Sequence, residues 1–530
     1  MQKIKNLLYN DLFVYGIIII LGFLLYFKSL FFNFVYLDDN ELILNNINFL
    51  SDIHNFFTAF TTDVFHVSHE AAVYYRPLLT VSFMFDAILG GASPFLFHLS
   101  STIIHLVASI LVFTLLNKLR YQRAVSFFLS IIFLVHPVLT QAVSWVPGRN
   151  DSLLAVFVLA SFIFFLGYLE ERKTRSIILS VSFFALAMFT KETAIVLPFM
   201  CLMYLWAVNF LRWKVVSRFL LGWFLALCAW YPLHSLAMKN PIPMTVKDML
   251  ESLFKNMPAS IQLLGKIFFP FNLSVLPNIS DTTFFWGIGS ILLIIILVVY
   301  SWKKEKFYKN SYKMMLFGLA WFFLFLIPSF VRPDPTIIAD FIEHRVYLPI
   351  VGILIFLVES RFFDNLRGKM KKLFLIAGFV VIVVFFTVTF FHQNNFANRI
   401  AFWKNASENS PHSPLAQRNM GAMYQLDNRN DLAKEYYLKT IALHNLEPMV
   451  HSNLGLIYAD EGNYSEAEKE YQTEISFNPT YANAHFNLGL LYYKTNRLNQ
   501  ARNEWEKTLE INPDYTDATN ALSIINTAEK

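Results

Sequence analysis

The stretch Phe34-Val35-Tyr36-Leu37-Asp38-Asp39-Asn40 follows an apolar run that extends from Leu12 to Phe32. A run of about 21 apolar residues is long enough to cross a bilayer as a helix, and it exceeds the roughly 7–15 apolar residues of a signal peptide. We therefore expect a retained membrane span with an acidic pair at its exit. A carboxylate near lipid is costly unless it is hydrated, paired or needed for a reaction. Asp38 and Asp39 are therefore candidate catalytic residues.

The composition is that of a membrane protein. Of 530 residues, 55% are hydrophobic, 17% are aromatic and only 15% are charged, whereas soluble domains carry about 25% charged residues. The net charge is only +5, and no basic-aromatic stretch indicates a nucleic-acid partner. Cys201 and Cys228 both lie in apolar runs, so we expect buried thiols and neither a disulfide nor a zinc site.

Apolar runs of spanning length recur as far as residue 391 and then stop. Because lipid offers no partner for unpaired backbone groups, each run should form a helix. The sequence predicts an all-α bundle of about eleven spans. Their expected positions are 12–32, 94–117, 124–137, 152–169, 176–189, 193–211, 216–237, 284–301, 314–330, 345–358 and 373–391.

The basic residues predict the orientation of these spans in the cell's inner (cytoplasmic) membrane. If the N-terminus is cytoplasmic, every dense basic cluster falls on the cytoplasmic side, as the positive-inside bias requires. Asp38 and Asp39 then face outward, and an odd number of spans places the C-terminal region outside. Residues 258–271 could be interfacial, re-entrant or a further span, and a further span would upset this parity. The basic clusters lie within 118–123, 172–175, 212–218, 303–313 and 361–372.

A repeat of 34 residues begins after the last span. Asn419-Met420-Gly421-x-x-Tyr424 recurs as Asn453-Leu454-Gly455-x-x-Tyr458 and as Asn487-Leu488-Gly489-x-x-Tyr492. This is the tetratricopeptide pattern, in which small residues lie where paired helices touch. The expected domains are a membrane domain over 1–392, a linker over 393–413 and an α-solenoid over 414–530. The solenoid comprises repeats at 414–447, 448–481 and 482–515 and a capping helix.

Several external loops each present a cation near a span end, and these cations are candidate ligands for a phosphate. Taken singly, Arg or Lys at a lipid exit is usually a snorkelling anchor. Taken together, they surround the face that carries Asp38 and Asp39, and guanidinium and ammonium groups bind phosphate oxygens well. We predict that a donor phosphate is bound by Arg76, Arg149, Lys191, His344 and Arg345.

Other polar residues in or near the spans are candidates for supporting the site. His98 and His105 lie seven residues apart and share one helical face. We expect them to form hydrogen bonds within the membrane rather than to bind a metal, although the sequence leaves a divalent metal open. The complete supporting set is His98, His105, His136, Glu192 and Glu343.

An ordered set of motifs resembles the transmembrane and tetratricopeptide-repeat (TMTC-like) O-mannosyltransferases, a branch of the C-type glycosyltransferases. The resemblance covers nearly the whole chain, and we identify the chain as similar to a prokaryotic member. The matching stretches are Val35-Tyr36-Leu37-Asp38-Asp39-Asn40, Tyr75-Arg76-Pro77-Leu78, Pro94-Phe95-Leu96-Phe97-His98-Leu99 with His105, His136-Pro137-Val138-Leu139-Thr140-Gln141-Ala142-Val143, Gly148-Arg149-Asn150-Asp151, Lys191-Glu192 and Glu343-His344-Arg345-Val346-Tyr347-Leu348-Pro349.

The resemblance implies that Asp38 and Asp39 form the catalytic site. It implies a C-type helical bundle and inverting transfer of a sugar, often mannose, from a polyprenyl-phosphate carrier to a Ser/Thr hydroxyl of a protein. The expected partners are the lipid-linked donor, the bilayer and a protein acceptor bound by the repeats, with no nucleic acid. The resemblance implies no particular cofactor.

Two other functions fit parts of the sequence. The chain could be a membrane-anchored scaffold whose repeats recruit a protein, although about eleven spans are excessive for an anchor that one helix supplies. It could also be a ligase or polymerase of lipid-linked oligosaccharides, which shares the donor chemistry. A transporter is disfavoured because the spans show no paired halves.

Overall fold

The regular secondary structure of the described residues is helical, as the sequence predicts, apart from one isolated β-bridge between Ala72 and Pro241. The chain divides into two compact units, Met1–Phe402 and Trp403–Lys530. The boundary falls inside the segment predicted as a linker, which contains η12 (Gln393–Phe396) and α18 (Arg399–Asn409). The computed structural model describes residues 10–67, 72, 74–239, 241, 243–303, 311–331, 342–361 and 368–528.

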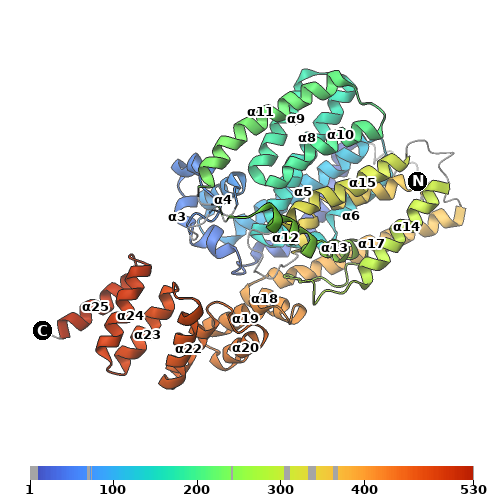
Figure 1. Ribbon diagram of the computed structural model, residues 1–530. Coiled ribbons are helices and arrows are strands. Elements are labelled where there is room, and N and C mark those ends of the chain that lie inside the picture. The colour runs from blue at the N-terminus through green and yellow to red at the C-terminus, as the bar shows by residue number, and fades with distance from the viewer. Residues whose placement is uncertain are drawn as a thin grey trace. The chain divides into compact units, whose positions relative to one another are not determined.

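Long apolar helices of the first unit lie side by side (Figure 1). Within the described ranges, seven helices are long and apolar enough to cross a membrane, or eight if a bent pair is one span. The protein is therefore a multi-pass membrane protein, whereas the count of about eleven spans stays a prediction. The long helices are α2 (Asp11–Tyr26) with η1 (Phe27–Phe31), α5 (Pro94–Lys118), η6 (Val146–Gly148) with α8 (Arg149–Glu171), α11 (Trp213–Ala237), α14 (Phe285–Lys303), α15 (Ser311–Leu326) with η9 (Ile327–Phe330), and α17 (Gly368–His392).

Shorter helices occupy the remaining predicted spans and the loops between spans. Residues 258–271 form a helix of only 10 residues, about 15 Å long, which is too short to cross the bilayer alone. The basic clusters at 303–313 and 361–372 lie partly outside the described residues. The shorter helices are η2 (Asn40–Leu44), α3 (Ile47–Leu50), η3 (Ile53–Phe56), η4 (Thr58–Phe60), α4 (Pro77–Gly90), α6 (Arg123–Leu134), η5 (Pro137–Leu139), α7 (Gln141–Ser144), α9 (Thr174–Thr190), η7 (Glu192–Val196), α10 (Leu197–Ala207), α12 (Val246–Asn256), α13 (Ala259–Phe268), η10 (Glu343–Val346) and α16 (Ile350–Glu359).

Helix α8 lies at the centre of the first unit. Its most apolar window is 72% buried, whereas those of α11 and α14 are 17% buried. It packs against α5, α9 and α10, and its residues Leu159, Phe162 and Phe165 belong to the main hydrophobic core. The poorly buried helices are at the periphery, where their apolar side chains face lipid.

Two pairs of glycines let helices cross at close range. A Cβ atom on Gly318 of α15 would lie 2.6 Å from the carbonyl oxygen of Gly352 on α16, and one on Gly265 of α13 would lie 2.6 Å from the nitrogen of Gly287 on α14. Both close neighbours are backbone atoms, which cannot rotate away. Small residues at helix crossings are typical of membrane proteins, where packing rather than hydrophobic exclusion drives association.

The second unit contains the predicted tetratricopeptide repeats, drawn in orange to red in Figure 1. Each predicted repeat comprises two helices that pack against each other. The equivalent glycines Gly421 and Gly455 lie against the rings of Tyr437 and Tyr471, at 2.7 and 2.9 Å from an added Cβ. The helices are α19 (Pro414–Leu426), α20 (Asn430–Leu443), α21 (Val450–Asp460), α22 (Tyr464–Phe477), α23 (Ala482–Lys494), α24 (Leu498–Ile511) and the capping helix α25 (Thr516–Ala528).

A buried histidine in the second repeat lies between two acceptors. His451 Nδ1 is 2.5 Å from Glu470 Oε2, and its Nε2 is 2.8 Å from the Asn445 carbonyl. The equivalent position in the first repeat is Gln417, whose Nε2 donates to the Pro411 carbonyl. An imidazole donates at both nitrogens only when it is protonated. Burial lowers the pKa of His451, but these bonds and the nearby carboxylates outweigh burial and raise it overall.

Substitution of Gly318 by alanine should destabilise the protein. The added methyl group must displace backbone at the α15–α16 crossing, and overpacking of this kind costs about 1–3 kcal/mol. Gly16→Ala is the matched control, because a Cβ there meets nothing within 4 Å and alanine favours helix. Thermal unfolding of the full chain in detergent should show a lower Tm for Gly318→Ala and an unchanged or higher Tm for Gly16→Ala. Equal melting of the two variants would contradict the close crossing.

The stability of the second repeat should depend on pH through His451. Because its pKa is raised in the folded state, its contribution is complete below the ordinary histidine value of about 6.5 and disappears as pH rises through the folded pKa. His451→Gln keeps a donor for the Asn445 carbonyl but lacks the charge. The Tm of this variant should be lower than that of the wild type at pH 5.5, and the difference should shrink towards pH 9. A Tm difference between the two proteins that grows with pH would show that His451 is not stabilised in its protonated form.

Candidate active site

The candidate site lies next to a break in one of the spans. Helices α6 and α7 meet at a bend of 51°, because Pro137 has no N–H to continue the hydrogen-bond ladder. The carbonyls freed at the break must find partners within the protein. The Leu134 carbonyl accepts from His105 Nε2 at 3.0 Å, and the Val135 carbonyl accepts from Thr389 Oγ1 at 2.8 Å. Side chains from α5 and α17 therefore replace the missing helical bonds.

His105 and His136 both support this break. Because His105 Nε2 donates to a carbonyl, its Nδ1 is the acceptor for the Tyr347 hydroxyl at 2.6 Å. His136 Nε2 donates to the Ile267 carbonyl at 2.9 Å, and its Nδ1 accepts the Val138 N–H. The hydrogen bonds predicted for His105 are therefore present, and His136 connects the break to α13.

Gln141 connects the segment after the break to two distant parts of the chain. Its Nε2 donates to the Val275 carbonyl at 2.9 Å, and its Oε1 accepts the backbone N–H of His344 at 3.3 Å. This fixes η10 beside α7. Trp145, which follows α7 directly, is thereby held next to the acidic pair that follows the first span.

Asp39 is a buried carboxylate whose donors are an indole and backbone N–H groups. It is 1% exposed, and its Oδ2 accepts from Trp145 Nε1 at 3.3 Å and from the Val35 backbone at 3.4 Å. Burial raises the pKa of Asp39 to about 6, although these hydrogen bonds act in the opposite direction. Asp38 is half-buried. The two neighbouring carboxylates therefore occupy different environments, and Asp39 has the pKa suited to accepting a proton near neutral pH.

A chain of contacts links Asp39 to a lysine on the other side of the site. The indole of Trp145 lies 5.4 Å, centroid to centroid, from the imidazole of His344. His344 Nε2 is 3.4 Å from Asp151 Oδ2. Lys191 Nζ contacts both oxygens of Asp151, at 3.0 and 2.8 Å. The structure thus gathers Asp39, His344 and Lys191, which belong to three distant motifs.

Arg76 lies near Lys191. Its Nη2 is 3.5 Å from Glu192 Oε1, and its guanidinium stacks on the ring of Tyr74 at 4.2 Å. With its amide oriented to satisfy both neighbours, Asn150 accepts from Arg76 and donates to the carbonyl preceding Lys191. The pKa of Lys191 is lowered by burial and by the charge of Arg76, while Asp151 opposes the change. Two cations therefore lie close together, and each contacts a carboxylate of its own.

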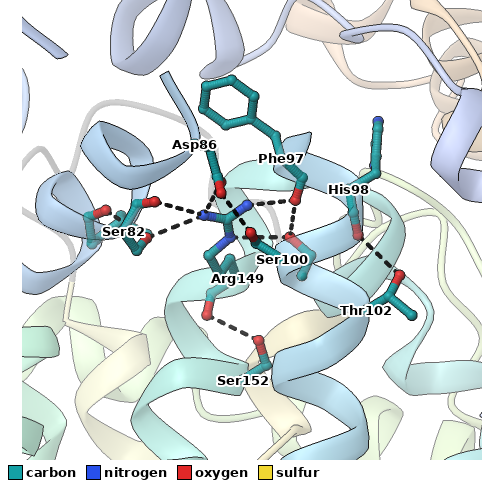
Figure 2. A network of polar contacts seen from close by, with 10 residues as sticks. Ser82, Asp86, Phe97, His98, Ser100, Thr102, Arg149 and Ser152 are labelled. Atoms are coloured by element: carbon teal, nitrogen blue, oxygen red, sulfur yellow. Dashed lines mark hydrogen bonds and ion pairs between the residues drawn. The ribbon is translucent and has the colours of Figure 1, made fainter. Parts of the chain in front are cut away.

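Arg149 lies in a separate, closed network, which Figure 2 shows from close by. Its side chain is 0% exposed, and its Nη1 contacts Asp86 Oδ2 at 2.6 Å. The Nε donates to Ser101 Oγ at 3.1 Å, and Nη2 donates to the Phe97 carbonyl. Nη1 also contacts Ser82. The three guanidinium nitrogens all donate to groups of α4 and α5, so Arg149 holds these helices to α8. A phosphate could bind this guanidinium only by displacing these partners.

Of the remaining predicted residues, Arg345 and Glu343 have polar partners of their own, and His98 makes an aromatic contact. Arg345 is half-buried and donates to the Ser329 carbonyl at 3.3 Å. Glu343 is fully buried and accepts from Lys266 Nζ at 2.7 Å. His98 is buried with its ring edge-on to Phe32. Neither of its ring nitrogens has a hydrogen-bond partner among the described residues, so the hydrogen bonds predicted for His98 are not observed. Of the five predicted phosphate ligands, the observed contacts thus gather Arg76, Lys191 and His344 and connect Arg149 and Arg345 to other groups.

Sequence reasoning missed two residues at the centre of the site, Trp145 and Asp151. Asp151 ends the Gly148-Arg149-Asn150-Asp151 motif, in which the cation Arg149 is the more obvious candidate for binding a phosphate. Trp145 precedes this motif. Its contact with Asp39 joins residues that are far apart in the sequence, so the sequence alone gives no signal of it. Across the part of the chain that is described, no three His, Cys, Asp or Glu side chains lie close enough together to hold a metal ion.

Comparisons with known proteins match the two units to two kinds of domain. Residues 77–235 match the family model "Dolichyl-phosphate-mannose-protein mannosyltransferase". Residues 455–496 and 482–515 match models of the tetratricopeptide repeat. The first match includes Trp145, Asp151 and Lys191 but begins after Asp38 and Asp39. The chain therefore has a mannosyltransferase-family region followed by tetratricopeptide repeats, which confirms the resemblance, while a prokaryotic origin stays a prediction.

Similar curated proteins share the first of these regions. "Protein O-mannosyl-transferase TMTC3" of Mus musculus is 32% identical over 194 residues, which cover 34% of this chain and 20% of that protein. "Protein O-mannosyl-transferase Tmtc1" of Drosophila melanogaster is 32% identical over 187 residues, covering 34% and 21%. The chain thus spans about a fifth of the length of these relatives. Among solved structures, the crystal structure of MamA is 19% identical, covers 31% of this chain and 86% of its own, and has a TM-score of 0.23.

Removal of the indole donor should raise the pKa of Asp39. The hydrogen bond from Trp145 favours the charged carboxylate, and Trp145→Phe keeps an aromatic ring against His344 without the N–H. Infrared titration of the full chain should show the protonated-carboxyl band of Asp39, identified by its loss in Asp39→Asn, persisting to higher pH in Trp145→Phe. An unchanged titration would mean that Trp145 only fills space.

Proposed function

We propose that this chain is an integral membrane glycosyltransferase. It transfers a hexose, mannose in the first instance, from a polyprenyl-phosphate donor to a Ser/Thr hydroxyl of a protein, with inversion. The observation that carries the proposal is the chain of contacts from the buried carboxylate of Asp39 through Trp145 and His344 to the Asp151–Lys191 pair. The family region and the similarity to proteins named O-mannosyl-transferases support the reaction class.

Asp39 serves as the general base in this proposal. A carboxylate with a pKa of about 6 is a stronger base than an ordinary aspartate near pH 4, yet it is still ionised at neutral pH. It takes the proton of the acceptor hydroxyl while the hydroxyl oxygen forms a bond to the anomeric carbon. The bond from that carbon to the phosphate oxygen breaks, and its electron pair leaves with the phosphate. One displacement inverts the configuration.

Lys191 and Arg76 stabilise the departing phosphate. Positive groups held where negative charge develops accelerate a reaction most when they are fixed in advance. Lys191 is fixed by both oxygens of Asp151, and Asp151 is fixed in turn by His344. Arg76 is only part-buried, and its partner Glu192 is half exposed. Arg76 can therefore exchange a weak ion pair for a phosphate more readily than Arg149 can leave its closed network.

The site faces away from the cytoplasm in this proposal. Helices α5 and α8 begin beside the Arg149 network and end at Lys118 and Glu171. Lys118 and Glu170 form an ion pair of 2.6 Å at those far ends. The candidate site and the basic cluster at 118–123 thus lie at opposite ends of the same spans, so the positive-inside bias places the site outside. The proposal also places the chain in the cell's inner membrane with the repeat unit outside, as the sequence predicts.

The repeat unit binds the protein acceptor in this proposal, and the membrane unit carries out transfer. Tetratricopeptide repeats form extended stacks whose surface suits polypeptide ligands. The membrane domain at 1–392, the linker at 393–413 and the repeat domain at 414–530 are proposed as the functional divisions. A divalent metal is not needed for the displacement described here.

Substitution of Asp39 by asparagine should abolish transfer. A positioned general base contributes about 10²–10⁴-fold to a rate, so kcat should fall by at least about 100-fold. Asp38→Asn should cost less, because its carboxylate is less buried. Glu41→Gln, an equal change of charge two residues away whose partner is Asn45, should leave transfer intact. The assay is intact mass spectrometry of an acceptor peptide with reconstituted protein and polyprenyl-phosphate mannose.

The pH dependence of the same assay tests the base directly. Because the pKa of Asp39 is raised to about 6, kcat/KM should fall as pH decreases through 6 and Asp39 becomes protonated. Activity that persists unchanged in Asp39→Asn would remove the catalytic role. A product carrying a whole oligosaccharide, instead of one hexose, would favour a ligase or polymerase.

A further inference from the structure

Helix α12 is a well-formed helix in the outer loop that follows α11. It begins with a reciprocal capping box, in which the Thr245 hydroxyl accepts from Asp248 N and the Asp248 carboxylate accepts from Thr245 N. Such a cap satisfies donors at the first turn and favours a defined helix start. The helix therefore has a fixed beginning that does not depend on its packing.

The helix is attached to the rest of the protein along a polar edge. Ser252 Oγ and Asn256 Nδ2 both donate to the Phe330 carbonyl, at 3.1 and 2.9 Å. Both side chains are buried, and they lie one turn apart. Phe330 is the last residue of the span Ser311–Phe330. These bonds place α12 at the level where a membrane-spanning helix ends.

The apolar face of α12 points away from the protein. Val246, Met249, Leu250 and Phe254 follow helical spacing along one side and are 73%, 42%, 48% and 66% exposed. A neighbouring side carries Lys247, Glu251 and Lys255, which are also exposed. A soluble helix would bury the first set against its own core. Here Ser252, Asn256 and the partly buried Leu253 contact the protein, whereas the exposed apolar and charged side chains are left to the surroundings.

We infer that α12 lies in the membrane interface with this apolar face in the acyl-chain region of the bilayer. The position at the end of a span supplies the depth, and that span itself exposes apolar side chains such as Leu316 and Phe323. Amphipathic helices with a distinct charged face bind the plane between headgroups and acyl chains. Lys247 and Lys255 then lie at headgroup level, where lysines extend towards lipid phosphates.

The bilayer contact stabilises a turn next to the candidate site. Phe330 belongs to η9, and the neighbouring Ser329 carbonyl accepts from Arg345. Arg345 follows His344, which contacts Asp151. The lipid-bound helix therefore lies on the same side of the membrane as Asp39 and holds η9 in place beside η10. This inference does not depend on the proposed reaction.

Spin labels on the two faces test the inference in the full chain. Cys228 is exposed and is replaced by serine, whereas Cys201 is buried. Leu250→Cys and Phe254→Cys carry labels on the apolar face, and Glu251→Cys and Lys255→Cys are the matched controls. The labelled proteins are reconstituted in vesicles of phosphatidylcholine and phosphatidylglycerol. Electron paramagnetic resonance then measures collisions with oxygen, which partitions into lipid, and with a water-soluble nickel complex.

The expected ratio of oxygen to nickel collisions is several-fold higher at 250 and 254 than at 251 and 255. Equal ratios at all four sites would place the apolar face in water and overturn the inference. Labels at 250 and 254 that both reagents fail to reach would show that protein, such as a second copy of the chain, covers the face, and would also overturn it. Unchanged thermal unfolding of each labelled variant confirms that the helix environment is not an artefact of misfolding.

Discussion

An unpaired polar group inside a bilayer has no water to bind, and this constraint organises the membrane unit. The chain breaks a span at Pro137, which frees the Leu134 and Val135 carbonyls, and both are bound by side chains from distant helices. Each of these hydrogen bonds also fixes the position of the helix that supplies it. The break brings α5, α17 and α13 to one place, and it lets Trp145 and Gln141 meet residues that follow other spans.

The same constraint explains why buried charges occur in pairs. Arg149 contacts Asp86 at 2.6 Å, Lys266 contacts Glu343 at 2.7 Å, and Lys191 contacts Asp151 at 2.8 Å. Breaking such a pair by removing one partner costs about 3–5 kcal/mol, so each pair is a structural requirement whatever else it does. Pairing alone therefore cannot identify a functional cation. The Lys191 pair differs because its carboxylate also contacts His344, which packs on Trp145.

Local pattern predicted most of the fold, and long-range pairing decided most of the site. Each 34-residue repeat was placed with its two helices because glycine and aromatic residues recur at fixed spacing, and Gly421 and Gly455 lie against Tyr437 and Tyr471. The apolar runs likewise coincide with helices. The prediction that the cations bind a phosphate rested only on their common position at the ends of spans. It could not reveal that the donors of Arg149 are taken by α4 and α5, or that Asp151 bridges His344 and Lys191.

The energetic cost of burying Asp39 is itself a reason to assign it a reaction. Its donors are one indole N–H at 3.3 Å and backbone N–H groups of its own loop, whereas Glu343 Oε1 accepts from an ammonium group at 2.7 Å and a backbone N–H at 2.9 Å. A buried carboxylate kept only for stability would be better served by the second environment. The raised pKa of Asp39 means that its charged form is held at a cost to folding near neutral pH. A protein retains such a cost where the basicity is used, so the poorly compensated carboxylate, not the well-paired one, is the better candidate for proton transfer.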